Sequence, residues 1–130
     1  MKKMKKLSIL FFALVSFSCS SQQIKCSEFR TGEFRYSDPS MVAYTIKRTD
    51  SLQIEKNLET NVEVHSSVQW KSECEYELTY VKITNVNRDV SDIIGKKIKV
   101  EITSTDGDFY EAHAQSDAID TYLQFEKVSQ

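Results

Sequence analysis

The chain is short of the residues that most catalytic and metal-binding motifs require. Its 130 residues include three glycines, one proline, three cysteines and two histidines. No glycine-rich phosphate loop, Gly-x-Ser-x-Gly elbow or Ser-x-x-Lys motif occurs. Two histidines on separate predicted strands, without any Cys-x-x-Cys pair, leave a zinc site without constituents. The sequence therefore predicts no catalytic residue, no metal and no cofactor.

Positive charge is scarce once the first residues are set apart. Lys2, Lys3, Lys5 and Lys6 account for four of the seventeen Lys and Arg, and all nineteen Asp and Glu come later. The rest of the chain thus carries thirteen basic against nineteen acidic residues, a net charge of −6. Affinity for nucleic acid comes largely from cationic contacts with phosphates. We therefore expect no nucleic-acid partner.

Long hydrophobic runs are lacking apart from one near the N-terminus. Leu7–Phe17 is apolar except for two serines, follows the four lysines, and is succeeded by the small residues Ser18 and Cys19. This is the layout of a secretory signal, and it is too short to span a bilayer as a stable helix. We expect residues 1–18 to be a signal peptide and the protein to be exported.

The position of cleavage decides whether the chain carries a lipid. Ser16-Phe17-Ser18-Cys19 fits the lipoprotein signal peptidase pattern loosely, which predicts lipidation of Cys19. The protein would then be a membrane-anchored lipoprotein of the periplasm or outer membrane, with 19–25 as its linker. Because Ser16-x-Ser18 is also a small-x-small site, ordinary cleavage to a soluble periplasmic protein is the alternative.

The three cysteines are an odd number, which calls for an explanation in an exported protein. If Cys19 takes the lipid, Cys26 and Cys74 remain as one pair in an oxidising compartment. A disulfide between them would stabilise the fold by about 4 kcal/mol in the chain-entropy model.

From about residue 29 onward, apolar and polar residues alternate in short runs. Ile98, Val100 and Ile102 alternate with charged residues, and Leu52 and Ile54 form the apolar side of a shorter run. This period of two is typical of strands with one buried face. The expected strands are 29–36, 41–48, 52–57, 62–70, 74–84, 96–104, 108–115 and 121–128. The carboxylates are expected on the outward, solvated parity.

Short connections between these strands predict consecutive antiparallel neighbours, that is, a meander. Residues 26–130 are therefore expected to form a single all-β domain, a lipocalin-like closed or partly open barrel of about eight strands. A two-sheet sandwich is the alternative. Asp106-Gly107 predicts a type I′ hairpin. At most one short helix is expected, and Asp89–Gly95 is the only stretch with a helical pattern.

The residues predicted to point inward include many aromatics. Among them are Phe34 and either Phe109 or Tyr110. These rings could line a cup for an apolar ligand, or they could simply fill a narrow barrel. Trp70 is expected to lie buried near the barrel floor, close to the disulfide. The candidate ligand-lining residues are Tyr36, Tyr44, Trp70, Tyr76, Tyr80 and Phe125.

The stretch Phe29–Tyr36 resembles the opening strand of lipocalin-like proteins, where Gly-x-Trp begins the barrel; Phe34 stands at the Trp position. Nearly the whole mature chain resembles a family of small exported flavobacterial proteins of unknown function. The stretches that carry this resemblance are Cys26–Tyr36, Arg48–Glu55, Trp70–Leu78 and Ile94–Lys97.

Members of that family are sometimes labelled DNA topoisomerase IV. A type II topoisomerase needs an ATPase domain, a strand-cleaving tyrosine and metal-binding acidic residues on a chain many times longer. The label therefore does not fit this chain.

Three functions follow as hypotheses. The first is a lipid-anchored envelope protein whose barrel binds a small apolar ligand. The second is a periplasmic protein-interaction module, such as an inhibitor or accessory subunit for another envelope protein. The third and least favoured is an enzyme that uses the barrel cavity, which a buried acid–base pair inside it would support.

Overall fold

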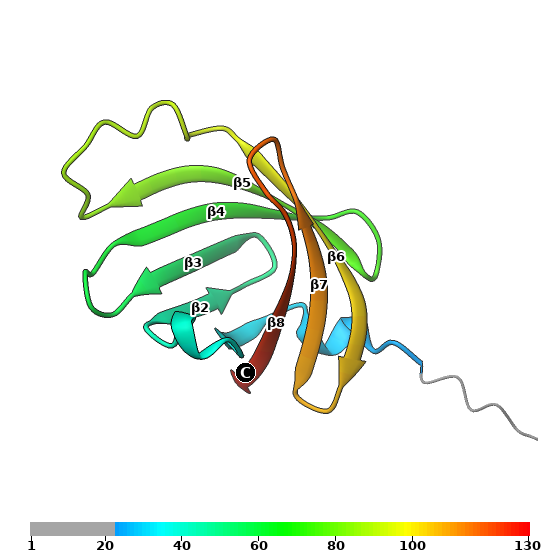
Figure 1. The fold of residues 1–130 in the computed structure, drawn as a ribbon. Coiled ribbons are helices and arrows are strands. Elements are labelled where there is room, and N and C mark those ends of the chain that lie inside the picture. The colour runs from blue at the N-terminus through cyan, green and yellow to red at the C-terminus, as the bar shows by residue number, and fades with distance from the viewer. Residues whose placement is uncertain (1–22) are drawn as a thin grey trace, which may run out of the picture.

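The computed structural model describes residues 23–130, which form a closed antiparallel barrel of eight strands (Figure 1). The strands are β1 (Gly32–Tyr36), β2 (Tyr44–Arg48), β3 (Leu52–Asn57), β4 (Glu63–Trp70), β5 (Glu75–Thr84), β6 (Lys97–Asp106), β7 (Phe109–Gln115) and β8 (Asp120–Ser129). Each strand pairs with its neighbours in sequence, and β1 pairs with β8. The predicted eight-stranded meander is confirmed, and the sandwich alternative is wrong. The expected signal peptide and Cys19 lie outside the described residues.

The ring closes where β1 meets β8. Glu33 pairs with Ser129 and Phe34 with Lys127, so the register shifts between these two pairs. Gly32, at the start of β1, has φ +131, and a Cβ there would lie 2.6 Å from the Ser129 carbonyl oxygen. Only glycine permits this close approach without strain. Closure at β1–β8 therefore depends on the absence of a side chain at residue 32.

The inward side chains pack most tightly in the half of the barrel next to the N-terminal segment. A short 3₁₀ helix, η1 (Cys26–Phe29), lies across that end and buries Cys26 and Phe29. The Phe29 ring lies 5.0 Å from that of Tyr110. The core consists of Cys26, Phe29, Phe34, Ile46, Val68, Tyr76, Leu78, Val100, Ile102, Tyr110, Ala112, Ala114 and Phe125. We call the end of the barrel that η1 covers the floor.

Two expected strands begin three residues later than predicted. Phe29 was expected in the first strand but ends η1, and the strand starts at Gly32. The second starts at Tyr44 because η2 (Pro39–Met41) precedes it. Asp38 caps η2 by accepting a hydrogen bond from the Ser40 amide. The apolar alternation continues through both segments, so periodicity alone could not mark these boundaries.

Two local predictions are wrong. Asp89–Gly95 is not a helix but a turn, in which the amide of Ile93 donates to the Val90 carbonyl at 2.9 Å. In the β6–β7 hairpin the loop residues are Gly107 and Asp108, and only Gly107 has positive φ. Glycine with positive φ at the first loop position is the pattern of a type II′ turn, not type I′.

The third strand faces the opposite way from its apolar pattern. Ile46 pairs with Glu55, and Arg48 pairs with Gln53. Directly paired residues share a face of the sheet. Because Ile46 points into the barrel, the polar residues of β3 point inward, and Leu52 and Ile54 point outward.

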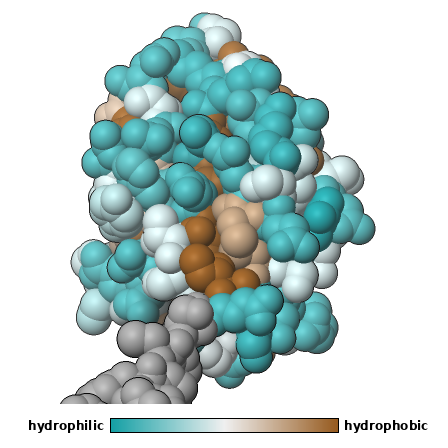
Figure 2. All heavy atoms as spheres, turned by 90° about the vertical axis from the view of Figure 1, so that its right-hand side faces the viewer, coloured by the Kyte–Doolittle hydropathy of each residue, from teal (hydrophilic) through white to brown (hydrophobic). Residues whose placement is uncertain are grey.

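Hydrophilic residues cover most of the outer surface on the side seen in Figure 2, where the largest apolar area is a narrow strip. Within residues 23–130, no helix has the length and apolar character needed to cross a membrane.

Candidate functional site

The barrel interior holds a cavity of about 280 Å³ above the packed floor. Its lining includes Met41, the last residue of η2, and Ile119 in the β7–β8 loop, and both lie at the end opposite η1. We call that end the mouth. Ligand pockets in proteins usually span about 300–1,000 Å³, so this cavity suits a molecule smaller than a typical drug. Side chains therefore fill the barrel at the floor, and the interior above it is hollow.

Arg48 lies at the bottom of the cavity with only 3% of its surface exposed. Its Nε donates to Gln53 Oε1 at 2.9 Å, and its Nη1 donates to the Phe29 carbonyl at 2.9 Å. Its Nη2 donates to the hydroxyls of Tyr76 and Tyr110 at 3.1 and 3.0 Å. Four of the five N–H groups of a guanidinium are thus used within the floor.

Aromatic faces complete the surroundings of Arg48. Its guanidinium carbon lies 4.6 Å from the ring centroids of both Phe34 and Tyr76. A cation over such faces is attracted by the ring quadrupole. The nearby phenol oxygens offset the effect of burial and raise the pKa of Arg48, so the group stays charged.

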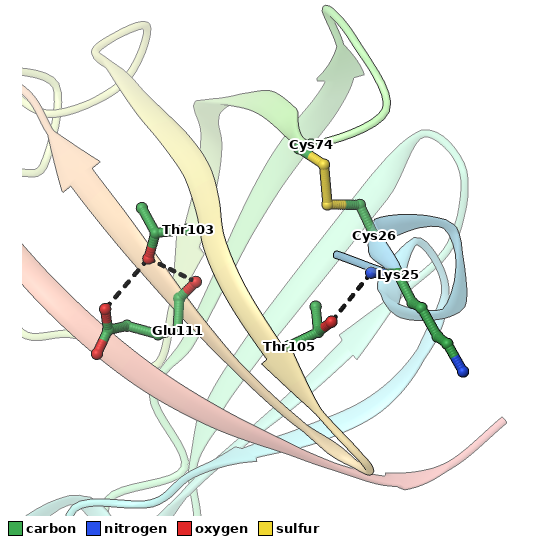
Figure 3. The surroundings of a disulfide bond; sticks show 6 residues. All are labelled: Lys25, Cys26, Cys74, Thr103, Thr105 and Glu111. Atoms are coloured by element: carbon green, nitrogen blue, oxygen red, sulfur yellow. Dashed lines mark hydrogen bonds between the residues drawn. A yellow bond between two sulfur atoms is a disulfide. The ribbon is translucent and has the colours of Figure 1, made fainter. Parts of the chain in front are cut away.

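The disulfide between Cys26 and Cys74 secures η1 to the barrel (Figure 3). The two Cα atoms are 5.2 Å apart. Close by, the Lys25 amide donates to Thr105 Oγ1 at 3.0 Å. The predicted pairing is confirmed, and its effect is to hold η1 across the floor.

One wall of the cavity is polar. Gln53 and Ser66, which pair across β3 and β4, are both buried, and Glu55 lies two residues from Gln53 on the same face. All three side chains line the cavity. The alternation of β3 therefore delivers an amide, a hydroxyl and a carboxylate to one side of the interior.

Glu55 is the single carboxylate among the residues that line the cavity. The Tyr36 hydroxyl donates to Glu55 Oε2 at 3.1 Å. Burial raises the pKa of Glu55, and the hydrogen bond from Tyr36 offsets part of that shift. No lysine, arginine or histidine of the described chain lies within 4.0 Å of this carboxylate. Glu55 thus has a hydrogen-bond donor but no counter-ion.

The negative charge of Glu55 affects the pKa values of the two neighbouring tyrosines, Tyr36 and Tyr80. Burial and then the Glu55 carboxylate raise the pKa of Tyr36. Burial, followed by the same charge, also raises the pKa of Tyr80. Both hydroxyls therefore stay protonated and can act as donors or acceptors.

The opposite wall is apolar. It is formed by β6, β7 and β8, whose apolar lining residues are Ile98, Val100, Ala114, Leu123 and Phe125; Thr121 of β8 adds one hydroxyl. Phe125 also packs on Tyr36, with ring centroids 4.9 Å apart. The cavity is thus two-sided, with a polar wall on β3–β4 and an apolar wall on β6–β8.

The predicted lining residues divide into three groups. Tyr36, Tyr76, Tyr80 and Phe125 line the cavity. Tyr44 contacts the Tyr36 ring edge-on at 6.2 Å but does not line the cavity.

Trp70 lies at the floor, as expected, but it is only partly buried. Its ring packs on that of Tyr76, with centroids 4.7 Å apart. The guanidinium carbon of Arg30 lies over the Trp70 ring, 5.1 Å from its centroid. Trp70 is therefore too far down the barrel to line the cavity. Of the two alternatives at 109 and 110, Tyr110 is buried and Phe109 is exposed.

The polar interior residues of β3, Gln53 and Glu55, were missed by sequence reasoning. In a simple amphipathic strand the polar residues face solvent, so these two were expected to point outward. One signal was available, since Arg48 shares parity with Tyr44 and Ile46. A charged residue on an apolar parity indicates an internal polar site.

The arrangement can hold a proton or a cation at Glu55 and accept or donate hydrogen bonds along β3–β4. The cavity lining contains no cysteine, histidine or lysine. Elsewhere in residues 23–130, no cluster of three or more His, Cys, Asp or Glu is arranged to hold a metal ion.

Compared with protein-family models, characterised proteins and solved structures, the chain gives no match. A proposal for the function must therefore rest on the geometry of the cavity.

Proposed function

We propose that this protein is an exported, lipid-anchored cell-envelope protein whose barrel binds a small amphipathic molecule. The observation that carries the proposal is the two-sided cavity of about 280 Å³, closed at the floor and reached from the mouth. A barrel interior that served packing alone would be filled by side chains. Here the floor is filled and the upper half is not.

The unfavourable free energy of burying the Glu55 carboxylate supports ligand binding rather than a purely structural role for the polar wall. Burying a carboxylate without a counter-ion is unfavourable. Groups that reduce stability in this way are typical of functional sites. The Glu55–Tyr36 pair could also transfer a proton, as the enzyme hypothesis requires, but the described residues that line the cavity include no histidine, lysine or cysteine to act with it.

The proposal is tested by filling the cavity. Ala114 lies on the apolar wall with 2% of its surface exposed, and leucine there would occupy space that a ligand needs. Native mass spectrometry of protein purified from the envelope should show a bound small molecule in the wild type and none in Ala114→Leu. The same spectra would show the lipid on Cys19. The control is Ala118→Leu, because Ala118 is exposed in the β7–β8 loop.

A protein-interaction module remains the second candidate because of the mouth. Val42 and Leu58 belong to adjacent loops and are 74% and 56% exposed. Exposed aliphatic side chains of this kind suit a protein interface. Val42→Ser with Leu58→Ser should abolish binding of an envelope partner while leaving the cavity intact. Unchanged capture of that partner by the double variant would exclude the mouth as its docking surface.

A further inference from the structure

The cavity places one carboxylate among aromatic rings, and this juxtaposition narrows the ligand class. Glu55 accepts a hydrogen bond from Tyr36, and the Phe125 ring lies against that of Tyr36. Tyr80 lines the same cavity from β5. Aromatic faces around a negative charge are the surroundings in which proteins bind ammonium groups.

The other charged group of the cavity is unsuited to a ligand. Arg48 directs its Nε, Nη1 and Nη2 to Gln53, Phe29, Tyr76 and Tyr110. Recognition of a carboxylate by arginine normally uses two parallel N–H groups of the guanidinium. Because the floor already occupies these donors, Arg48 does not offer that fork to an acidic ligand.

The counter-ion of Glu55 is missing from the described chain. The nearest polar contact found for it is the Tyr36 hydroxyl, which is neutral. The Glu55 carboxylate can therefore still accept a hydrogen bond from a cation or a strong donor on a ligand. The apolar wall opposite, with Ile98, Val100 and Leu123, offers no charged group, and its one polar side chain is that of Thr121 on β8.

From this geometry we propose that the cavity binds a small amphipathic amine, whose ammonium group pairs with Glu55 between Tyr36 and Tyr80 and whose apolar part lies against β6–β8. This inference rests on the proposed ligand-binding function and specifies its ligand class. The ligand enters at the mouth, where Met41 and Ile119 lie. Its charge compensates the Glu55 carboxylate, for which residues 23–130 supply no counter-ion.

The test uses three probes of the same chain length that differ in their headgroup, namely n-octylamine, n-octanol and n-octanoate. Isothermal titration calorimetry at neutral pH measures each dissociation constant with the purified full-length mature protein. We expect n-octylamine to bind at least about tenfold tighter than n-octanol, as a charge-assisted hydrogen bond would give. We expect n-octanoate to bind most weakly.

The variant Glu55→Gln keeps the shape of the side chain and an acceptor for Tyr36 but removes the charge. In this variant n-octylamine and n-octanol should bind with dissociation constants within about threefold of each other. The matched control is Glu59→Gln, which removes an exposed carboxylate from the β3–β4 loop near the mouth. The amine preference should survive there, which excludes general attraction to an acidic surface.

The outcomes separate the two levels of the proposal. Equal binding of amine and alcohol by the wild type, tighter binding of n-octanoate, or an amine preference that persists in Glu55→Gln would each overturn the amine assignment. In those cases binding of n-octanol would still support a ligand-binding barrel. Absence of binding by all three probes would contradict both the amine assignment and the proposed function.

Discussion

The guanidinium of Arg48, at the end of β2, donates from Nη1 to the carbonyl oxygen of Phe29 in η1 at 2.9 Å. Phe29 is the last residue of a segment that lies outside the sheet, so this bond joins the barrel to the structure that covers its floor. The same guanidinium reaches Tyr76 on β5 and Tyr110 on β7. One side chain therefore connects three strands and η1 through the barrel interior.

Arg48→Met should lower the free energy of unfolding by about 2–4 kcal/mol. Methionine fills similar space but donates nothing, which leaves the Phe29 carbonyl buried without its donor and leaves the Tyr76 and Tyr110 hydroxyls with only their mutual hydrogen bond of 3.3 Å. Denaturation in urea, followed by circular dichroism, measures the change. The control is Lys47→Met on the outward face of β2, where the side chain is 70% exposed. An equal loss in both variants would contradict a special role for Arg48.

Loss of the disulfide should also destabilise the barrel. Cys74→Ala is expected to lower the free energy of unfolding by about 2–5 kcal/mol, because the link constrains the unfolded chain and holds η1. Cys26→Ala should have the same effect, and the double variant should be no less stable than either single one. Additive losses would show that each cysteine stabilises the fold by packing rather than through the shared bond.

Gly32→Ala should disrupt closure of the ring. The added Cβ would lie 2.6 Å from the Ser129 carbonyl oxygen, at a backbone φ that L-residues rarely adopt. We expect the free energy of unfolding to fall by about 1–3 kcal/mol. Amide hydrogen exchange in β1 and β8 should become faster. The control is Gly95→Ala, where φ is also positive but no atom lies within 4 Å of the new Cβ. A smaller loss at Gly95 would separate the steric clash from backbone strain.

The stability of the ligand-free protein should fall as pH rises through the titration of Glu55. Burial raises the pKa of Glu55, so the folded state binds its proton more tightly than the unfolded state. The stabilisation from this difference is fully present below the ordinary glutamate pKa and is lost as pH rises through the raised value. Ionisation of the neighbouring Tyr36 and Tyr80 falls far above this window, since their pKa values are also raised.

Glu55→Gln should therefore have a higher Tm than the wild type at pH 7, and the two values should converge near pH 4. Differential scanning fluorimetry across this range measures the effect. Glu101→Gln serves as the control because Glu101 is exposed on the outward face of β6. A Tm difference for Glu55→Gln that is constant with pH would falsify the assignment of the effect to ionisation.

Much of the architecture was predictable because it depends on local pattern. The period of two over 96–104 and 108–115 reports strands directly, and short polar connections force neighbouring strands to run antiparallel. The odd number of cysteines similarly led to the Cys26–Cys74 pair. Boundaries at Phe29 and Met41 were not predictable, because apolar residues serve equally well in a strand or in a 3₁₀ turn that covers a barrel end.

The cavity was decided by the tertiary structure. Alternation along β3 states that two faces differ, but it does not state which face is inside. The register of Ile46 with Glu55 and of Arg48 with Gln53 settles that choice, and it turns the polar face inward. Pairing between strands thus outweighs the burial preference of Leu52 and Ile54, since only a one-residue slip in the register of β3 would turn these two residues inward. The sequence by itself determined a meander of about eight antiparallel strands; the register of β2 with β3 in the closed barrel determined that a carboxylate lies inside it.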